Sequence, residues 1–161
     1  SDIVFHPRDV ISLLFSDKQI IGGIYPFKHL SFEALKNNIF STQNLMTLIE
    51  KSASYHIDKK SMNEIKNVDY IQTGFLLIHK SVFETIIEDV GSSIEYSNDI
   101  QGYDEHSYNG KFYDFFQVGI ENGKYLSEDY GFCSIVKQYN IPIYADPTIK
   151  LTHIGQFFFH G

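Results

Sequence analysis

The sequence predicts an α/β domain with a mixed sheet, and two observations support this prediction. Short apolar runs that are typical of buried strands alternate with segments whose apolar residues recur every three to four positions, as on the buried face of a helix. Asn122-Gly123 separates two short strand-like segments, which is typical of a tight hairpin turn and indicates a sheet that is not purely parallel. With 161 residues, the chain is expected to form a single domain over residues 1–161.

Seven segments predict strands, because each is apolar or alternates apolar with polar residues. The segment 19–24 is apolar throughout, which is typical of a central strand, whereas the alternation over 65–70 is typical of an edge strand. The strongest strand pattern is that of residues 73–78. In chain order, the predicted strands are 2–5, 19–24, 65–70, 73–78, 113–118, 142–145 and 150–155.

Helices are predicted between these strands from capping residues and from apolar faces. Pro7 stands at a tolerated first-turn position of the first helix. The residues expected on the buried face of that helix are Val10, Ile11, Leu13 and Leu14. Ser31 and Ser81 are expected to cap two further helices, and a short helix is expected around 45–49.

The acidic composition argues against two classes of function. The net charge is −7 and no tract is rich in Lys or Arg, so nucleic-acid binding through phosphate neutralisation is not expected. No apolar run approaches the roughly 20 residues of a membrane-spanning helix, so no membrane span is expected. Cys133 is the only cysteine, which is compatible with a reducing compartment such as the cytoplasm and is typical of a small core residue.

Aromatic residues near polar segments hint at a carbohydrate ligand. The chain has 14 Phe and 11 Tyr, and rings of these types commonly line sugar sites, although they also fill cores. The stretch 91–111 is polar, acidic and weakly periodic, which is typical of a lid, a binding loop or a disordered segment. An aromatic tail, residues 157–159, follows the last predicted strand.

An acidic pair follows Ser127 near the C-terminal end of the chain. Ser127 is suited to be the N-cap of a helix, and Glu128 and Asp129 then lie in its first turn. Negative charge is favoured there because the exposed N–H groups make the start of a helix electropositive. Ordinary helix capping therefore explains this pair by itself, and a catalytic carboxylate is the alternative.

Other candidate residues lie at the ends of predicted strands, where ligands bind in α/β sheets. They are Asp2, Gly22, Gly23, Tyr25, Thr73, Gly74 and His153. A carboxylate and an imidazole suit a divalent ion such as Mn²⁺, although Asp2 alone is typical of a solvated residue and His153 of a satisfied strand histidine. The glycine pair also has a structural explanation, the relief of crowding between strand and helix. The other histidines show no metal-ligand spacing and are expected to be incidental; they are His6, His29, His56, His79, His106 and His160.

Five segments carry a family resemblance. They are residues 1–7 (SDIVFHP), 21–28 (IGGIYPFK), 72–78 (QTGFLLI), 125–133 (YLSEDYGFC) and 153–155 (HIG). In this order they resemble the C-terminal two-thirds of small GT-A-fold glycosyltransferases of the kind found in large DNA viruses and bacteria. The resemblance spans essentially the whole chain. It implies a GT-A-like α/β fold, with a mixed, mainly parallel sheet flanked by helices, that lacks the N-terminal nucleotide-binding strands of the family.

The resemblance implies a metal site. In the family, a D-x-D motif ends a strand and holds a divalent metal against the diphosphate of a sugar nucleotide. Residues 1–2 resemble the last two positions of such a motif, Asp-Ser-Asp, so the chain is expected to begin inside it. A further N-terminal segment or other domains are then expected to complete the protein. The resemblance makes Asp2 and His153 the protein ligands of Mn²⁺ or Mg²⁺.

The resemblance also implies substrates and roles. The expected donor is a nucleoside-diphosphate sugar, preferably a UDP-sugar, and the expected acceptor is a hydroxyl of a glycan or glycoprotein, with inversion at the transferred sugar. Asp129 is the implied base and Glu128 its neighbour or substitute. Consecutive side chains in a helix point about 100° apart, so only one of the two faces the acceptor squarely. The residues implied to line the sugar pocket are Gly22, Gly23, Tyr25, Lys28, Thr73 and Gly74.

Two other functions remain open from the sequence. A carbohydrate-binding or scaffolding domain with a decayed transferase site would also carry these segments, because the N-terminal part of the family pattern is absent. A metal-dependent hydrolase is supported only by Asp2 and His153 and has no H-x-x-H-type cluster of ligands.

Overall fold

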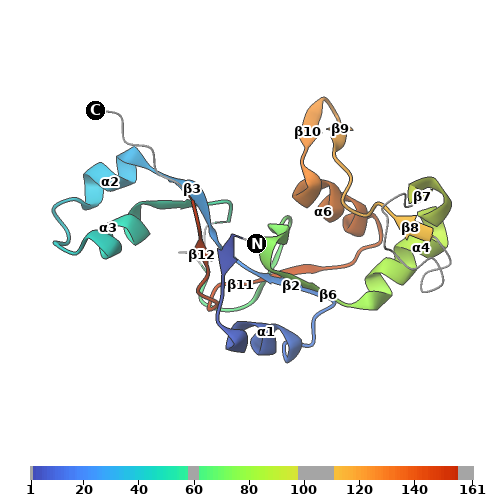
Figure 1. Cartoon of the computed structure of the whole chain (residues 1–161), viewed down its shortest axis with the longest axis horizontal. Helices are drawn as coiled ribbons and strands as arrows, with labels where there is room; N and C mark the ends of the chain where they lie inside the picture. The colour runs from blue at the N-terminus through green and yellow to red at the C-terminus, as the bar shows by residue number, and fades with distance from the viewer. Residues whose placement is uncertain (1, 58–61, 98–110, 156–161) are drawn as a thin grey trace.

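The computed structural model describes residues 2–57, 62–97 and 111–155. At its centre lies a four-stranded sheet with the strand order β5-β11-β2-β6 (Figure 1). These strands are Lys66–Val68 (β5), Ile143–Asp146 (β11), Ile20–Gly23 (β2) and Leu76–Ile78 (β6). The α/β class is therefore confirmed, and so are the central position of the strand within 19–24 and the edge position of the strand within 65–70.

The sheet is mixed, as predicted, but it is not mainly parallel. β2 and β11 run parallel, whereas β5 and β6 each run antiparallel to their neighbour. The chain path explains the difference, because β5 and β6 begin beside the ends of β11 and β2: Lys66 lies opposite Ala145, and Leu76 lies opposite Gly22. The chain leaves the sheet after β2 and returns at the same end. A parallel strand would have required a crossover to the other end.

Helices cover both faces of this sheet. Successive side chains of β2 point to opposite faces, so each face of the strand packs against a different set of helices. The helices are α1 (Pro7–Leu14), α4 (Lys80–Ile94) and α6 (Glu128–Gln138). Ile20 shares one hydrophobic cluster with residues of α4 and α6, including the fully buried Phe132. Ile21 shares a second cluster with Leu13 of α1. Figure 1 shows α1 and α6 on opposite sides of the sheet.

Helix α1 begins where predicted but buries less than predicted. His6 is its N-cap, and the Asp9 carboxylate accepts a hydrogen bond from the His6 N–H at 2.8 Å, which completes a capping box. Leu13 is buried as expected. Ile11 and Leu14, by contrast, stay 50% and 57% exposed, because the helix contacts the sheet along one narrow stripe.

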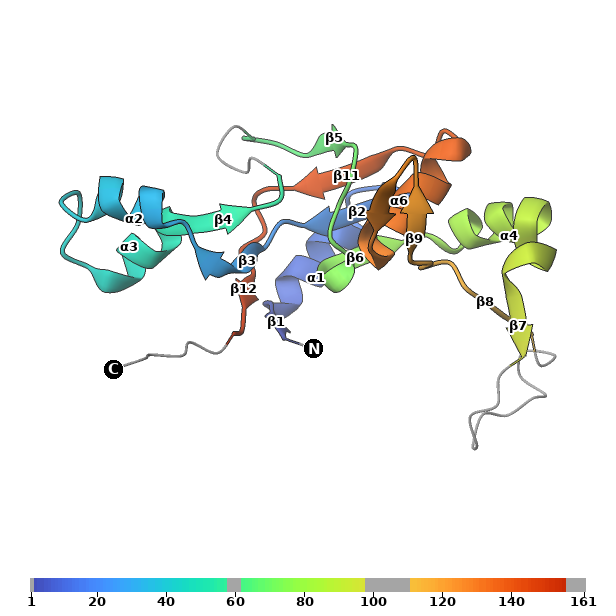
Figure 2. The ribbon, with the colours of Figure 1, turned by 90° about the horizontal axis from the view of Figure 1, so that it is seen from above.

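A helical hairpin and a two-stranded ribbon extend beyond the carboxyl end of β2 (Figure 2). The elements are β3 (Pro26–Leu30), α2 (Phe32–Asn38), α3 (Leu45–Ser52) and β4 (Ala53–Tyr55). β3 and β4 pair antiparallel, and the helices lie between them in the chain. Ser31 caps α2 as predicted, since its Oγ accepts a hydrogen bond from the Ala34 N–H at 3.2 Å. The predicted helix around 45–49 is α3.

The segment 73–78 contains a shorter strand than predicted. Residues Thr73–Phe75 form a 3₁₀ turn, and only Leu76–Ile78 pair with β2. The N–H groups of Thr73 and Gly74 donate to the side chains of Asp129 and Tyr25 rather than to a strand. The 3₁₀ turn therefore serves the candidate site.

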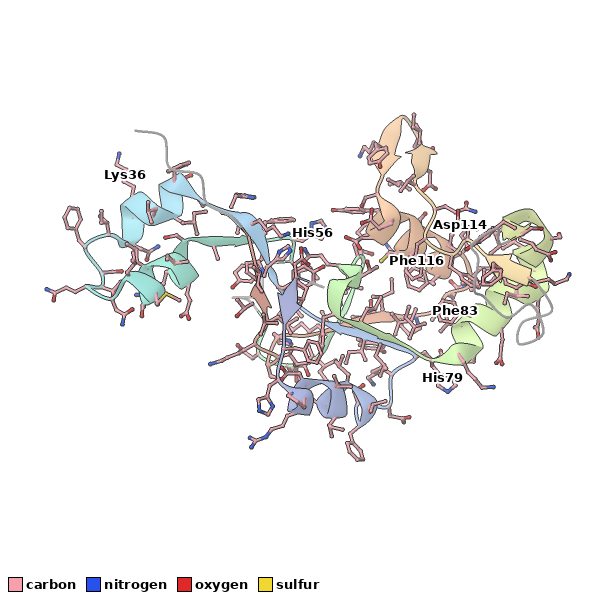
Figure 3. The ribbon with its side chains drawn as sticks, in the orientation of Figure 1. Lys36, His56, His79, Phe83, Asp114 and Phe116 are labelled. Atoms are coloured by element: carbon pink, nitrogen blue, oxygen red, sulfur yellow. The ribbon has the colours of Figure 1, made fainter. Side chains whose placement is uncertain are left out.

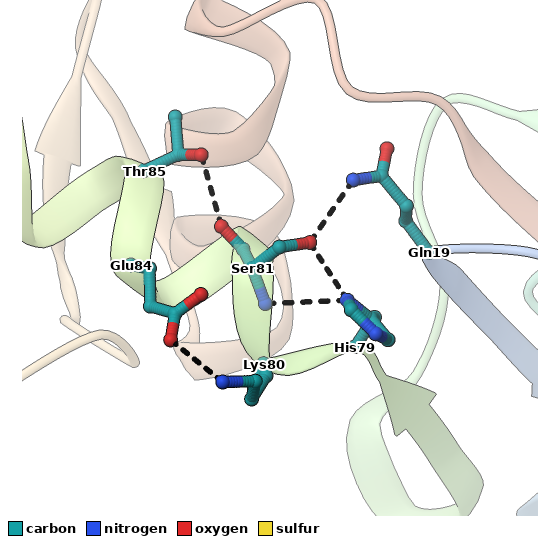
Figure 4. A network of polar contacts seen from close by, with 6 residues as sticks. All are labelled: Gln19, His79, Lys80, Ser81, Glu84 and Thr85. Atoms are coloured by element: carbon teal, nitrogen blue, oxygen red, sulfur yellow. Dashed lines mark hydrogen bonds and ion pairs between the residues drawn. The ribbon is translucent and has the colours of Figure 1, made fainter.

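Helix α4 is capped by His79, so the prediction that Ser81 caps it is wrong. His79 Nδ1 accepts a hydrogen bond from the Ser81 N–H at 3.3 Å (Figure 4). The Ser81 hydroxyl instead accepts a hydrogen bond from Gln19 Nε2 at 3.2 Å, which ties the residue before β2 to the start of α4. An imidazole nitrogen can replace a hydroxyl or carboxylate oxygen as a cap because it too is an acceptor.

Two small antiparallel strand pairs lie between α4 and α6 in the chain. They are β7 (Glu95–Ser97) with β8 (Lys111–Tyr113), and β9 (Gly119–Glu121) with β10 (Lys124–Leu126). α4 and β7 occupy the start of the predicted loop 91–111, whose residues 98–110 lie outside the described part. The predicted strand 113–118 is limited to the last residue of β8. Asn122 and Gly123 have φ values of 50° and 75°, which confirms the predicted tight turn.

The two ends of the described chain meet in a separate ribbon. β1 (Ile3–Val4) pairs antiparallel with β12 (Thr152–His153), which places Ile3 opposite His153. Of the last predicted strand, 150–155, only Thr152–His153 form a strand, and this strand pairs with β1 apart from the main sheet. The aromatic tail 157–159 lies outside the described residues. Among the described helices, none combines the length and apolar character needed to cross a membrane.

Candidate active site

The β1–β12 ribbon brings Asp2 and His153 together. The backbone N–H of Ile154 donates to the Asp2 carbonyl at 2.8 Å, and the Asp2 carboxylate forms an ion pair with Lys28 of β3. His153 Nε2 lies 3.4 Å from the same carboxylate oxygen, Asp2 Oδ2. The Lys28 ammonium is the main reason why the pKa of Asp2 lies below its usual value. Three of the predicted site residues thus form one cluster.

The orientation of His153 suits a metal ligand. Its Nδ1 lies 2.8 Å from the Pro26 carbonyl oxygen, which can only accept, so Nδ1 carries the proton. When the ring is neutral, the lone pair therefore lies on Nε2, the nitrogen nearer to the Asp2 carboxylate, and a backbone partner on the other ring nitrogen is the usual support of a metal-binding histidine. The separation of 3.4 Å between the two donor atoms suits a shared small cation.

The protein donors present here make up only part of a coordination sphere. Within residues 2–57, 62–97 and 111–155, no group of three or more His, Cys, Asp or Glu side chains is placed to hold a metal. Mg²⁺ and similar ions are often bound by one or two carboxylates and by substrate phosphates, so two protein donors fit such an ion if a phosphate-containing ligand supplies the rest. The Lys28 ammonium must move away from Asp2 for this to happen.

The second cluster of predicted residues lies at the start of α6. Asp129 is half-buried, and its Oδ1 accepts hydrogen bonds from the Thr73 hydroxyl and, at 2.9 Å, from the Thr73 N–H. Both bonds use Oδ1, and Oδ2 has no hydrogen-bond partner within the described part of the chain. The carboxylate is therefore fixed on one side and open on the other. Glu128 is exposed, which favours Asp129 as the functional member of the pair.

Ser127 takes the N-cap position of α6 but does not cap it as predicted. Its hydroxyl makes no cap hydrogen bond, although its carbonyl accepts the first helical hydrogen bond, from the Gly131 N–H at 2.7 Å. The ordinary capping explanation of the acidic pair is weakened accordingly, because Asp129 bonds to Thr73 and not to the helix start.

Tyr25 connects the two clusters. Its ring lies edge-on to His153, with 5.2 Å between ring centroids, and its hydroxyl accepts a hydrogen bond from the Gly74 N–H at 3.1 Å. Burial raises the pKa of Tyr25, and the negative charges of Asp129, Asp2 and Glu128 raise it further. Tyr25 therefore contacts both His153 and the 3₁₀ turn whose Thr73 holds Asp129.

The predicted glycines are required by close packing. A Cβ at Gly22 would lie 2.7 Å from the Phe75 carbonyl oxygen, and a Cβ at Gly23 would lie 2.6 Å from the Leu151 side chain. Gly22 and Gly23 are buried within β2, and this packing accounts for both without a ligand. Gly74 has an exposed position, where a Cβ would lie 2.5 Å from the Tyr25 hydroxyl oxygen.

Sequence reasoning missed the surroundings of Asp129. His56, which was expected to be incidental, lies beside β3 (Figure 3), with its Nε2 2.5 Å from the Tyr130 hydroxyl. The abundance of aromatic residues near polar segments was the one feature of the sequence that pointed to such a site.

Other histidines, and Cys133, have structural roles or lie outside the described residues. His6 and His79 serve as helix caps, while His106 and His160 lie outside the described residues. Cys133 is a buried core residue as predicted, and burial raises the pKa of its thiol.

A groove of about 460 Å³ lies beside the Asp2 cluster. It is bounded by β3, α3, β4 and the segment leading into β12, and Lys28 and His153 contribute to its wall. The groove combines apolar and charged groups, so it can hold a ligand that has both kinds of surface.

The chain matches no protein-family model, and comparisons with curated proteins and with solved structures found no match.

Proposed function

We propose that this chain carries the catalytic part of a metal-dependent GT-A glycosyltransferase. One observation carries the proposal: Tyr25 joins a carboxylate–imidazole pair suited to a cation to a separate, fixed carboxylate suited to a base. These two features are what sugar transfer from a nucleoside diphosphate requires. One stabilises the charge on the leaving diphosphate, and the other accepts the proton of the acceptor hydroxyl.

The reaction assigns each group a task. The acceptor oxygen forms a bond to the anomeric carbon of the donor sugar, while the bond from that carbon to the diphosphate oxygen breaks and the diphosphate leaves with the electron pair. Asp129 Oδ2 takes the proton of the acceptor hydroxyl. Thr73 keeps the carboxylate in place by binding Oδ1. Asp2 and His153 would hold a divalent cation, which would supply positive charge to the leaving diphosphate.

Replacement of Asp129 by Asn tests the proposal. The variant keeps the shape of the side chain and should lower the turnover number by about 10²–10⁴-fold, because the base is lost, while donor binding is kept. Turnover is measured with Mn²⁺ and a panel of UDP- and GDP-sugars, and donor binding by calorimetry. Glu128→Gln is the matched control at the exposed neighbouring position and should retain turnover. Unchanged turnover in Asp129→Asn would exclude this carboxylate as the base.

A non-catalytic sugar-binding domain with a decayed site is the second candidate. The observation that favours it is the ion pair between Lys28 and Asp2, because an ammonium already neutralises the proposed metal-ligand carboxylate. Titration with UDP in the presence and absence of Mn²⁺ separates the two functions. The transferase should bind UDP more tightly with Mn²⁺, and the decayed site should show no dependence on the metal.

A further inference from the structure

Five aromatic rings form a continuous row on the surface beside the candidate base. In spatial order they are Tyr70, Tyr130, His56, Phe27 and His29, together called the aromatic row. Neighbouring ring centroids in this order lie 4.8, 5.0, 6.1 and 5.5 Å apart. The rings come from the segment before the 3₁₀ turn, from α6, from the residue after β4 and from β3. Tertiary folding therefore assembles the row from distant parts of the sequence.

The two ends of the row lie at functional features. Tyr130 directly follows Asp129 in the first turn of α6 and packs against Tyr70. At the other end, Phe27 and His29 contribute to the wall of the groove of about 460 Å³. A ligand that lies along the row from the groove would therefore reach the first turn of α6, which carries Asp129.

Hydrophobic-core formation does not explain the row. Phe27 is 38% exposed, His29 is also exposed, and His56 and Tyr130 are only half-buried. Of the five residues, only Tyr70 packs partly against the main hydrophobic cluster. Ring surfaces that remain accessible to solvent in a connected row are available to a ligand.

Polar groups alternate with the apolar ring faces. The Tyr130 hydroxyl lies 2.5 Å from His56 Nε2, and the Lys137 ammonium lies 3.9 Å from the centroid of the Tyr70 ring. A sugar ring has the same pattern, with C–H groups on its faces and hydroxyls around its edge. A lipid chain would cover these polar groups without forming hydrogen bonds to them, whereas sugar hydroxyls can both donate and accept. The net charge of −7 disfavours a nucleic acid.

We infer that the aromatic row is the acceptor subsite and that its ligand is a glycan of at least two sugar units. One sugar stacks on the ring of Phe27, and the terminal sugar presents its hydroxyl to Asp129. This inference rests on the proposed function and deepens it, since it identifies the acceptor as a saccharide chain.

Sugar binding to the whole chain, without any donor, provides the first test. The probes are lactose, maltotriose, cellotriose and chitotriose, studied by saturation-transfer NMR and by titration. At least one should bind, with contacts to aromatic protons. Phe27→Leu keeps an apolar side chain in β3 but removes the ring, and it should weaken binding about tenfold. Phe40→Ala, which removes a ring that is 97% exposed and lies outside the row, is the matched control and should bind as the wild type does.

Transfer kinetics provide the second test and separate the two proposals. Phe27→Leu should raise the KM for the acceptor about tenfold and leave the KM for the donor unchanged. Sugar binding that depends on Phe27 in a chain that transfers nothing supports the row and overturns the transferase. Transfer with an unchanged acceptor KM in Phe27→Leu overturns the row and leaves the transferase standing. Failure of all four sugars to bind overturns the row as well.

Discussion

Asp129 and Asp2 are the two carboxylates of the candidate site, and the fold holds them in opposite ways. Asp129 is half-buried at the start of a core helix and is held by the backbone and the side chain of Thr73. Asp2 is exposed directly before a two-stranded ribbon, and it forms an ion pair with the exposed side chain of Lys28. The difference suits the two proposed roles. A base must be oriented before the reaction, whereas Asp2 can bind a metal only if it exchanges the Lys28 ammonium for that metal.

The region around Asp129 is held by close backbone packing against α6. Gly131 lies two residues after Asp129, and the backbone of Gln117 crosses the helix at this point, so that a Cβ on Gly131 would lie 2.0 Å from the Gln117 carbonyl oxygen. Around Asp2, by contrast, the described contacts are side-chain ion pairs and the short β1–β12 ribbon. Substitutions around Asp129 should therefore affect stability and catalysis together. Substitutions around Asp2 should change mainly the local electrostatics and have little effect on stability.

Replacement of Gly131 by Ala should have the largest effect. Because the added methyl group meets a backbone oxygen, the helix and the segment around Gln117 must separate, which should cost about 3 kcal/mol of unfolding free energy. For a domain of this size, this lowers Tm by about 6–12 °C in a thermal melt. Gly119→Ala is the matched control, since a Cβ there meets nothing within 4 Å, and its Tm should stay within about 2 °C of the wild type. An unchanged Tm in Gly131→Ala would mean that the start of α6 is not clamped.

Replacement of Thr73 by Val should have the next largest effect. The variant keeps the shape and the N–H of residue 73 but removes the hydroxyl that holds Asp129 Oδ1. The loss of a hydrogen bond to a charged group should lower the unfolding free energy by about 1–2 kcal/mol. Turnover should fall about tenfold with little change in the acceptor KM, because Thr73 acts only by positioning Asp129. Thr73→Ser, which retains the hydroxyl, should recover most of both losses, and equal defects in the two variants would contradict this role.

Replacement of Tyr25 by Phe tests the connection between the two regions. Removal of the hydroxyl leaves the Gly74 N–H without its acceptor and should cost about 1 kcal/mol. Because the folded-state pKa of Tyr25 is raised, its stabilising contribution is complete below its unfolded value near pH 10 and is lost as pH rises through the folded value. Urea unfolding at about pH 8 and about pH 11 should therefore show a smaller alkaline loss in the variant than in the wild type. An identical alkaline loss would show that Tyr25 titrates normally.

Sequence patterns predicted those parts of the fold that are set by local chemistry. β2 and β11 are apolar segments buried in the sheet, and Asn122-Gly123 has the left-handed conformation that a tight hairpin turn requires. Residues 73–75 were predicted to be a strand, because the apolar pattern does not show that their N–H groups bind Asp129 and Tyr25. Tertiary partners thus overrode local strand preference here.

The candidate site was predicted in part, and its missing part depends on tertiary contacts. Asp129 and Thr73 were both proposed from the sequence, but their hydrogen bond joins residues that are 56 positions apart. The Tyr130–His56 contact spans 74 positions, and neither residue has a motif that would identify it. Only the family resemblance placed Asp2 near His153, because pattern and composition give no information on the pairing of β1 with β12.

Replacement of Lys28 by Met should have the smallest effect on stability, because both partners of its ion pair are exposed. Without the ammonium, the pKa of Asp2 should rise toward its ordinary value of 3.8, which an NMR titration of the Asp2 carboxyl carbon measures directly. Since the wild-type pKa is lowered, the contribution of the pair is present above pH 3.8 and is lost as pH falls through the lowered value. The two proteins should therefore differ most in stability near neutral pH and converge in acid. Lys80→Met, which breaks an exposed pair on α4, should leave the Asp2 titration unchanged.

The Lys28→Met variant also tests whether the Lys28 ammonium and a metal compete for Asp2. If they compete, Lys28→Met should bind Mn²⁺ more tightly than the wild type. Equal Mn²⁺ affinities of the two proteins would show that the ammonium and the metal do not compete.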